Sequence, residues 1–422
     1  MKKLFTISMM LLAGSKIFAQ GAVLDTVVMG PGYSNEIFYS LPNDEQGSSG
    51  SYNWQLAFAT NLMDASIRVN HALGMSVYQD PNIDSTGFAT LDTTGIATWP
   101  MLYNSDTSWR KGAFNEHANS ANPFDFGWGT YSMTTHDVTG DSVYVVRIAP
   151  PFQPIMWLKL FFKKKTSTND YIFRIAYLDN TFDQVYTVPC ATYTSKNFIY
   201  AALQTGMIDR EPASSTWDIT FNRYDTYIPG PGYYPVTGVS SNFGVTVAQA
   251  SPVDVNAVSY TNYAGMYHTN MTEIGYDWKF FNNGTGQYEL VDSTAYFIKL
   301  ADGNIWKMVF TGFESATGTI MFSKEHVFTN GINELNSTLN SVHVYPNPSL
   351  SNATLMFDTK TAGNISIEIS DVMGRIVSVE NINAAAGFQT HALHTSTLCN
   401  GTYFVTVANA NEKQSTQLVV AH

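Results

Sequence analysis

The sequence is poor in cysteine, in charged residues and in long apolar runs. Its two cysteines, Cys190 and Cys399, lie far apart without the spacing of a metal or redox site, so we expect no disulfide between them. Charged residues make up only 13% of the chain, and 34 acids outnumber 22 bases. This deficit of bases argues against nucleic acid as a partner, because a nucleic-acid surface needs clustered Lys and Arg. After residue 20, no run approaches the roughly 20 apolar residues of a membrane-spanning helix.

The sequence also lacks the short motifs that mark common enzyme classes. It contains no HExxH zinc pair, no G-x-S-x-G elbow, no P-loop and no dinucleotide-binding glycine pattern. Scattered Asp and Glu residues could still meet as a glycosidase pair in three dimensions, and the sequence leaves that alternative open. We expect a protein without enzymatic activity and without a metal site.

Residues 1–19 have the layout of a secretory signal peptide. Lys2 and Lys3 precede an apolar stretch of roughly ten residues, and the small residue Ala19 precedes the expected cleavage point. Cleavage there would remove three lysines and no acid, which changes the formal net charge from −12 to −15. We therefore expect an acidic mature protein that works outside the cytoplasm.

Aromatic residues and turn-forming residues are abundant. Phe, Trp and Tyr make up 14% of the chain, and strand-like segments alternate with stretches rich in Gly, Asn, Ser and Thr. Helical periodicity is almost absent. This pattern predicts an all-β protein built from antiparallel sheets, with long polar loops between the strands.

The strand-like segments occur twice in the same order. A tryptophan precedes alternating apolar residues in "NWQLAF" at Trp54 and again in "TWDITF" at Trp217, and we expect both rings to be core anchors. Further matches pair Tyr39 with Tyr200, Gly127 and Trp128 with Gly275 and Tyr276, Tyr144 with Tyr296, Arg147 with Lys299, Lys159 with Lys307, and Phe162 with Phe310. The separation drifts only from 163 to 148 residues. We infer two tandem β domains, at residues 20–190 and 191–328.

Three stretches within the copies predict loops. In the second copy, Asp302-Gly303 favours a tight two-residue hairpin turn. The first copy has "APPFQP" at the matching place, and its prolines predict a longer, stiffer loop before Trp157, either a cover for a ligand or an ordinary rigid connection. The basic run Lys163–Lys165 is expected at a solvated hairpin tip.

The end of the chain differs in composition. Residues 329–342 are typical of a polar linker, and short strands separated by turn residues fill 343–422. There "VYPNP", "ISIEISDVMGRIV", "LCNGTYFVTV" and "QLVV" follow one another and resemble the C-terminal sorting domain of type IX secretion substrates. The final "VVAH" departs from the basic ending common in such domains. The resemblance implies a small β-sandwich, contact with the type IX secretion machinery, and release from or attachment to the outer cell surface.

A second resemblance covers residues 191–325. There "FIYAAL", "TWDITFNRYD", "IGYDWKFFNNGTGQYEL" and "AYFIKLADGNIWKMVF" resemble, in order, the HmuY-type haem-binding proteins, and residues 22–190 follow the same pattern more loosely. The resemblance implies two all-β domains of this class. The founding members of the family are surface proteins that take haem from host carrier proteins, so haem is the cofactor and such a carrier the partner that it implies.

The haem ligands implied by this resemblance are only partly present. The founding member uses two histidines, and Asn283 stands where the second would be, although an amide cannot replace it. Upstream, "NYAGMYHTNMTEIG" offers His268 with Met266 or Met271 as candidate haem ligands, which are residue types that haem iron accepts. The same stretch also fits a solvated polar loop.

Two other histidines, His71 and His136, are isolated in the sequence, and His117 stands where the first copy roughly matches His268. We expect His71, His117 and His136 to be ordinary surface or loop residues. Two functions remain open. The protein is a secreted or cell-surface protein of the HmuY-like class that captures haem, or it is a surface adhesion or glycan-binding protein that kept the fold without haem.

Overall fold

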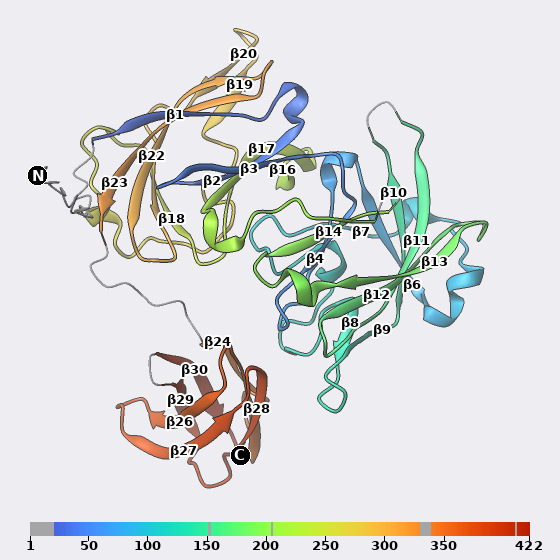
Figure 1. Ribbon diagram of the computed structural model, residues 1–422, viewed down its shortest axis with the longest axis vertical. Helices are drawn as coiled ribbons and strands as arrows, with labels where there is room; N and C mark the ends of the chain where they lie inside the picture. Colours follow the sequence, from blue (N-terminus) through green and yellow to red (C-terminus); the bar gives the residue numbers. More distant parts are fainter. Residues whose placement is uncertain (1–20, 151–152, 204–205, 330–338, 410–411) are drawn as a thin grey trace, which may run out of the picture.

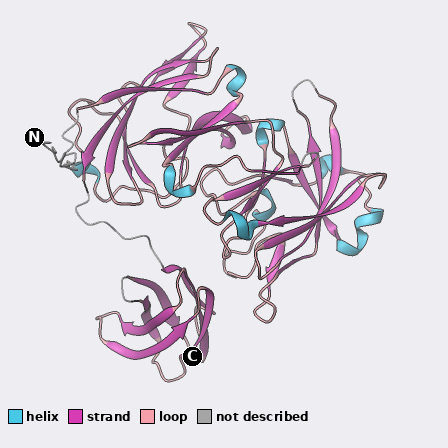
Figure 2. Ribbon diagram, in the orientation of Figure 1, coloured by secondary structure: helices cyan, strands magenta, loops and turns pink. Residues whose placement is uncertain are grey.

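The computed structural model describes residues 21–150, 153–203, 206–329, 339–409 and 412–422, so the expected signal peptide lies outside the described residues. Antiparallel strands dominate them, and the helices are short 3₁₀ turns (Figures 1 and 2). None of the helices within these ranges is long and apolar enough to cross a membrane. The predicted all-β fold is confirmed. The 3₁₀ turns are η1 (Pro31–Tyr33), η2 (His71–Leu73), η3 (Ser85–Thr90), η4 (Ile96–Thr98), η5 (Ala113–Asn115), η6 (Cys190–Tyr193), η7 (Ser214–Thr216) and η8 (Tyr260–Tyr263).

One sandwich, which we call the inserted sandwich, is formed by β4 to β15 and lies on the right of Figure 1. Its sheets have the orders β13-β12-β11-β10-β6-β7 and β15-β14-β4-β5, and β8 and β9 attach to the first through β11. The strands are β4 (Leu56–Ala59), β5 (Ile67–Val69), β6 (Ser76–Asp84), β7 (Met101–Leu102), β8 (Gly129–Tyr131), β9 (Val138–Gly140), β10 (Ser142–Ile148), β11 (Met156–Lys165), β12 (Asp170–Tyr177), β13 (Asp183–Pro189), β14 (Phe198–Ala202) and β15 (Gly206–Ile208).

A second sandwich, the outer sandwich, combines the first three strands of the chain with β16 to β23 (Figure 1). Its sheets have the orders β1-β23-β22-β21-β18 and β17-β16-β2-β3, and β19 and β20 form a separate hairpin. The strands are β1 (Val23–Val28), β2 (Asn35–Ser40), β3 (Asp44–Gly50), β16 (Ile219–Ile228), β17 (Gly232–Ser241), β18 (Thr246–Ala250), β19 (Lys279–Asn282), β20 (Gln287–Leu290), β21 (Ala295–Lys299), β22 (Ile305–Glu314) and β23 (Thr319–Phe328).

The two sandwiches have matching strand orders, but each combines strands from both sequence copies. β1, β2 and β3 correspond to β13, β14 and β15 in the order of the sheets, and β1 of the first copy pairs with β23 of the second. In the outer sandwich β2 pairs with β16, and in the inserted sandwich β14 pairs with β4. The sheets therefore do not follow the expected boundary between residues 190 and 191. The inserted sandwich interrupts the outer one between Gly50 and Ile219.

Ring contacts in the two cores support the duplication. Phe58 stacks on Phe173 with centroids 5.5 Å apart and planes at 27°, and Phe221 stacks on Phe322 at 5.7 Å and 24°. Trp54 meets Tyr200 edge-on at 5.0 Å, as Trp217 meets Phe38 at 5.2 Å. The two tryptophans thus occupy equivalent places, as predicted.

Two of the residue matches proposed between the copies are shifted by one or two positions along the chain. Ile219 pairs with Tyr39 whereas the equivalent Leu56 pairs with Ala201, so Tyr39 corresponds to Ala201 and not to Tyr200. One residue changes the face of a strand, because successive side chains point to opposite sides. Likewise, Trp128 and Trp278 are both fully buried and contact the equivalent rings of Phe162 and Phe310. Trp278, rather than Tyr276, therefore corresponds to Trp128.

Two local expectations also need correction. The β21–β22 connection is not a two-residue turn. Leu300 N–H donates to the Asn304 carbonyl, which encloses three loop residues, and only Gly303 of the Asp302-Gly303 pair has positive φ. The run Lys163–Lys165 is not a solvated tip, because it ends β11 and the Lys165 ammonium is buried, where it donates to the carbonyls of Asn61, Leu62 and Asp64.

A third, smaller sandwich ends the chain (lower part of Figure 1). Its sheets have the orders β24-β25-β28 and β27-β26-β29-β30, and it encloses its own apolar core. β24 begins at Leu339, so the sandwich includes the last residues of the expected linker 329–342, whose residues 330–338 lie outside the described ranges. The strands are β24 (Leu339–Tyr345), β25 (Asn352–Thr359), β26 (Gly363–Asp371), β27 (Ile376–Ala384), β28 (Gly387–His394), β29 (Gly401–Ala408) and β30 (Lys413–Val420).

Candidate ligand-binding surface

The candidate haem ligands lie in different environments. Met266 and His268 are exposed, and His268 exchanges backbone hydrogen bonds with Val247 of β18. Met271 is only 3% exposed, and its backbone N–H donates to the Thr107 carbonyl of the inserted sandwich. Asn283 lies in the exposed turn between β19 and β20. For Met271 to bind iron beside His268, its side chain would have to leave its packed position.

A row of aromatic rings crosses the junction between the inserted and outer sandwiches. We call it the aromatic stack, and it consists of His71, Tyr103, Tyr233 and Tyr227. Tyr103 and Tyr233 are nearly parallel, with centroids 3.5 Å apart and planes at 8°. His71 lies parallel to Tyr103 at 6.1 Å, and Tyr227 meets Tyr233 edge-on at 5.7 Å. The stack is buried at His71 and 63% exposed at Tyr227.

The β16–β17 hairpin brings the two halves of the stack together. Tyr227 and Tyr233 are cross-strand partners beside its turn, where Gly230 and Gly232 have positive φ. On the inserted sandwich, η2 contacts β16 and carries His71. His71 lies in a connection between strands, which is one of the two places expected for it, but its side chain is not on the surface, because this hairpin covers it.

Carboxylates flank the aromatic stack. The His71 Nδ1 atom lies 2.8 Å from Asp225 Oδ2, although the contact is poorly aligned for a hydrogen bond. Glu116 accepts a 2.6 Å hydrogen bond from the backbone N–H of Tyr103. Burial, followed by the charges of Asp225 and Glu116 among other groups, raises the pKa of the Tyr103 hydroxyl, which stays protonated and able to donate. The stack therefore combines flat apolar rings with hydroxyl donors and carboxylate acceptors.

The other two histidines match their sequence-based interpretation. His117 is exposed and its Nδ1 lies 2.8 Å from the Gln79 side-chain oxygen. His136 is also exposed, and its Nδ1 contacts the Tyr131 hydroxyl at 2.7 Å. Neither residue belongs to the aromatic stack. Both cysteines are free, Cys190 buried and Cys399 exposed.

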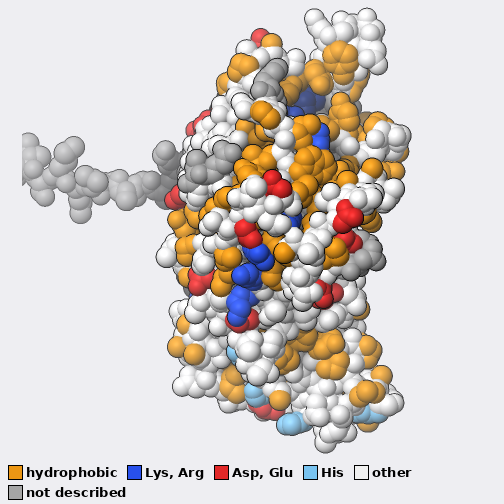
Figure 3. Space-filling view, turned by 90° about the vertical axis from the view of Figure 1, so that its right-hand side faces the viewer, with side chains coloured by type: hydrophobic (Ala, Val, Ile, Leu, Met, Phe, Trp, Pro, Cys, Tyr) orange, Lys and Arg blue, Asp and Glu red, His pale blue; other side chains and the backbone are white. Residues whose placement is uncertain are grey.

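A second candidate surface is the face formed by β10 to β13. On the side of the molecule to which this sheet belongs, Figure 3 shows apolar side chains gathered over the upper part, with Lys and Arg side chains among and below them. Trp157 of β11 stacks on Tyr78 of β6 at 6.3 Å, and Ile155 and Val185 are about half exposed. Phe152 of the predicted proline-rich loop lies outside the described residues.

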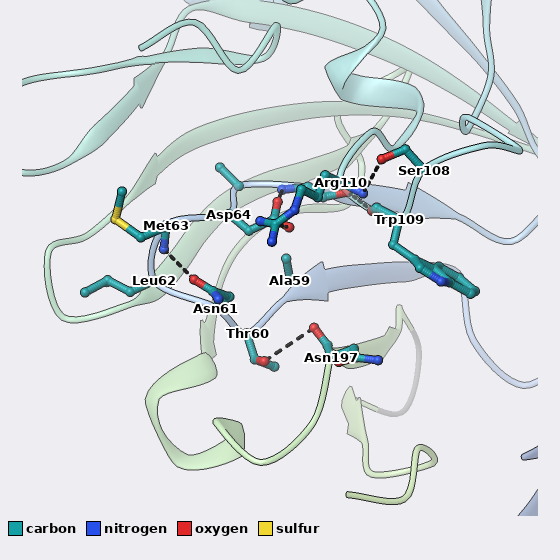
Figure 4. Close-up of polar contacts among 12 residues, drawn as sticks. Ala59, Thr60, Asn61, Leu62, Met63, Asp64, Ser108, Trp109, Arg110 and Asn197 are labelled. Carbon is teal, nitrogen blue, oxygen red and sulfur yellow. Dashed lines mark hydrogen bonds and ion pairs between the residues drawn. The ribbon is translucent and has the colours of Figure 1, made fainter. Parts of the chain in front are cut away.

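A cavity of about 410 Å³ lies between the inserted sandwich and the C-terminal sandwich. The inserted sandwich lines it with Phe124 and Tyr131, and the C-terminal sandwich with Met356 and Phe388. Leu62, Met63 and Arg110 also line it, and Figure 4 shows the segment 59–64 with Asp64 directed toward Arg110, at an oxygen-to-nitrogen distance of 3.6 Å. Part of this cavity exists only while the C-terminal sandwich is in place.

Comparisons with known proteins identify the family of the last of the three sandwiches. Residues 343–421 match the family described as the secretion system C-terminal sorting domain. No curated protein matches the chain. A similar solved structure is that of dimeric latent PorU from Porphyromonas gingivalis, with 10% identity, 92% of this chain and 34% of that chain covered, and a TM-score of 0.18. The chain thus spans about a third of that protein, and the TM-score is too low to indicate a common fold.

The sorting domain defines the route and destination of the protein. A type IX sorting domain at residues 343–421 indicates export by that machinery and either secretion or attachment to the outer cell surface. It also makes the machinery a partner of this chain. The HmuY-like resemblance of residues 191–325 rests on the sequence motifs alone.

Proposed function

We propose that the exported protein is a non-enzymatic ligand-binding protein and that its aromatic stack takes carbohydrate. The observation that carries the proposal is the Tyr103–Tyr233 pair, contributed by two sandwiches and continued by the exposed ring of Tyr227. An exposed flat ring can pack against the C–H face of a sugar. Carboxylates such as Asp225 accept hydrogen bonds from sugar hydroxyls, and tyrosine hydroxyls can donate or accept.

The position of the stack also favours a binding role. Tyr227, Tyr233 and Tyr234 lie beside one hairpin turn and are all more than two-fifths exposed. Large aromatic side chains are usually buried, and their concentration at an exposed site is typical of recognition surfaces. The acidic mature protein suits a neutral or cationic ligand better than an anionic one.

A glycan array probed with residues 21–329 tests the proposal. We expect binding to defined glycans and a loss of about tenfold or more in affinity for Tyr227→Ala, since a central aromatic contact is worth about 1–2 kcal/mol or more. Tyr288→Ala is the control, because that ring is 40% exposed on β20 of the outer sandwich and lies outside both candidate surfaces. The absence of any glycan ligand, or equal losses in both variants, would contradict the proposal.

Haem capture stays a prediction of the HmuY-like resemblance. Titration of the same protein with hemin would show a Soret shift at micromolar protein if it binds, and His268→Ala and Met271→Ala would then report on the candidate ligands. Tight hemin binding without any glycan binding would favour the haem alternative over the carbohydrate one.

A further inference from the structure

Exposed apolar side chains concentrate in one short segment of the sorting domain. Val372, Met373, Ile376, Val377 and Val379 all fall within eight residues, and Met373 is 88% exposed, the highest value among the exposed large apolar residues of the described chain. The domain has a closed core of its own, to which these five side chains do not belong. Folding of the domain therefore gives no reason for them to be apolar.

The strand register places part of this segment on one face of the sheet. Ser370 of β26 pairs with Ile376 of β27 on one side and with Phe404 of β29 on the other. Glu368 pairs with Val379 on the same face, because residues two apart share a side. Ile376, Val379 and the 43% exposed Phe404 therefore form an apolar patch. We call these three residues, together with Val372 and Met373, the β27 patch.

The turn beside the β27 patch is held in one shape by Asp371. Its Oδ1 atom accepts hydrogen bonds from the backbone N–H groups of Met373 and Arg375, at 3.0 and 2.9 Å. Its Oδ2 atom accepts a 3.0 Å bond from Arg375 Nε. Gly374 supplies the positive φ that the turn needs. Val372 and Met373 are thus presented by a preorganised turn, which lowers the entropic cost of binding a partner.

The opposite sheet of the sorting domain faces the rest of the chain. Tyr345 meets Phe124 edge-on at 5.0 Å, and Phe388 meets Tyr131 at 5.9 Å. These contacts use β24 and β28, whereas the β27 patch lies on the other sheet, where β27 is an edge strand. An edge strand offers unpaired backbone N–H and C=O groups to a partner strand. The patch stays accessible while the domain rests on the inserted sandwich.

We propose that the β27 patch is the surface by which the type IX secretion machinery recognises this protein. The family match makes that machinery the partner of this domain, and the domain must be recognised before the protein reaches the outside. The partner site would combine an apolar groove for Met373, Ile376 and Phe404 with a strand edge that pairs with β27.

Export of full-length precursor variants from a host that has the type IX machinery tests the proposal. We expect the double variant Met373→Ser and Ile376→Thr to lower the secreted fraction about tenfold or more, with precursor accumulating in the periplasm. Leu350→Ser is the matched control, because Leu350 is an apolar residue of the same domain, 68% exposed and outside the patch. Thermal unfolding of each purified precursor should be unchanged, since the substituted side chains are exposed.

Three results would overturn the proposal. The first is wild-type export of the double variant with its fold intact. The second is an equal export defect in Leu350→Ser, which would show that any lost apolar side chain matters. The third comes from sedimentation of the purified precursor: a dimer that the double variant converts to monomer would make the patch a contact between copies of this chain.

Discussion

The exchange of strands between the two copies predicts which pieces of this protein can fold alone. Residues 51–213 contain every strand of the inserted sandwich, β4 to β15, in one continuous segment. Residues 22–190 correspond to the first copy in the sequence, yet they lack β14 and β15 and carry β1 and β2 without their partners β23 and β16. We expect the first segment to fold as a cooperative unit and the second to fail.

The expected loss of stability in residues 22–190 can be estimated from the side chains that β14 buries. Ile199 is 0% exposed in the core of the inserted sandwich, and on the other face of β14 Phe198 and Tyr200, 3% and 6% exposed, pack against Trp109 and Trp54. Full burial of a large apolar side chain is worth about 1.5–3 kcal/mol, so the three together contribute about 5–9 kcal/mol. A typical domain has only about 5–15 kcal/mol of net stability, so a sandwich without β14 should be unfolded or molten.

Urea denaturation followed by tryptophan fluorescence and far-UV circular dichroism measures both segments. Residues 51–213 should give one sharp transition with both probes, as two-state unfolding requires. Residues 22–190 have nearly the same length and serve as the matched comparison. A cooperative transition for 22–190 together with none for 51–213 would refute the exchanged pairing and restore the boundary near residue 190.

Two further predictions concern a buried lysine and the maturation of the protein. Burial lowers the pKa of Lys279 to about 7, and its Nζ atom lies 4.2 Å from the Trp278 ring centroid. Between that pKa and the ordinary 10.5 the unfolded state holds a proton that the folded state has released, so stability should rise with pH across this window. Lys279→Met should remove up to about 3 kcal/mol of this rise between pH 6.5 and 9.5, measured as the free energy of unfolding at the two pH values, and an unchanged pH dependence would contradict it. Mass spectrometry of the exported protein should show a C-terminus between residues 329 and 342, whereas intact protein ending at His422 would argue against removal of the sorting domain.

The sequence could predict the strands and their duplication, because both depend on local patterns. Alternating apolar residues identify a half-buried strand wherever it occurs, and anchors such as Trp54 and Trp217 keep their order in both copies. The ring contacts of these two tryptophans with Tyr200 and Phe38 confirm the match. The sorting domain was also identifiable, because its motifs are contiguous.

The partner of each strand could not be predicted in the same way. β2 and β14 have similar patterns, and either could add to the edge of β4 or of β16 with its apolar side inward. The choice depends on long-range pairing, which a local pattern does not encode. The burial of His71 was not predicted for the same reason, because the hairpin that buries it lies about 150 residues further along the chain.

Two asparagines, Asn70 and Asn242, also support the duplication, but only the structure shows their equivalent roles. The Asn70 side-chain nitrogen donates to the carbonyls of Ser51 and Trp54, and that of Asn242 donates to those of Ser214 and Trp217. Both amides thus hold the segment that leads into the tryptophan strand. Nothing in the neighbouring residues marks either asparagine as special, because its partners come from an earlier loop.

The insertion of one sandwich into the other explains how a binding surface made from both can be rigid. The chain crosses between them twice, and Arg210 lies at one crossing, where it forms a 2.7 Å ion pair with Glu36 and places its guanidinium 4.8 Å from the Tyr200 ring centroid. Trp109 of the inserted sandwich adds a 2.7 Å hydrogen bond from its indole nitrogen to the Ser241 carbonyl. Each sandwich is therefore tied to the other by two chain crossings and by these side-chain contacts. The halves of the aromatic stack are therefore fixed before a ligand arrives, and little ordering entropy remains to be lost on binding.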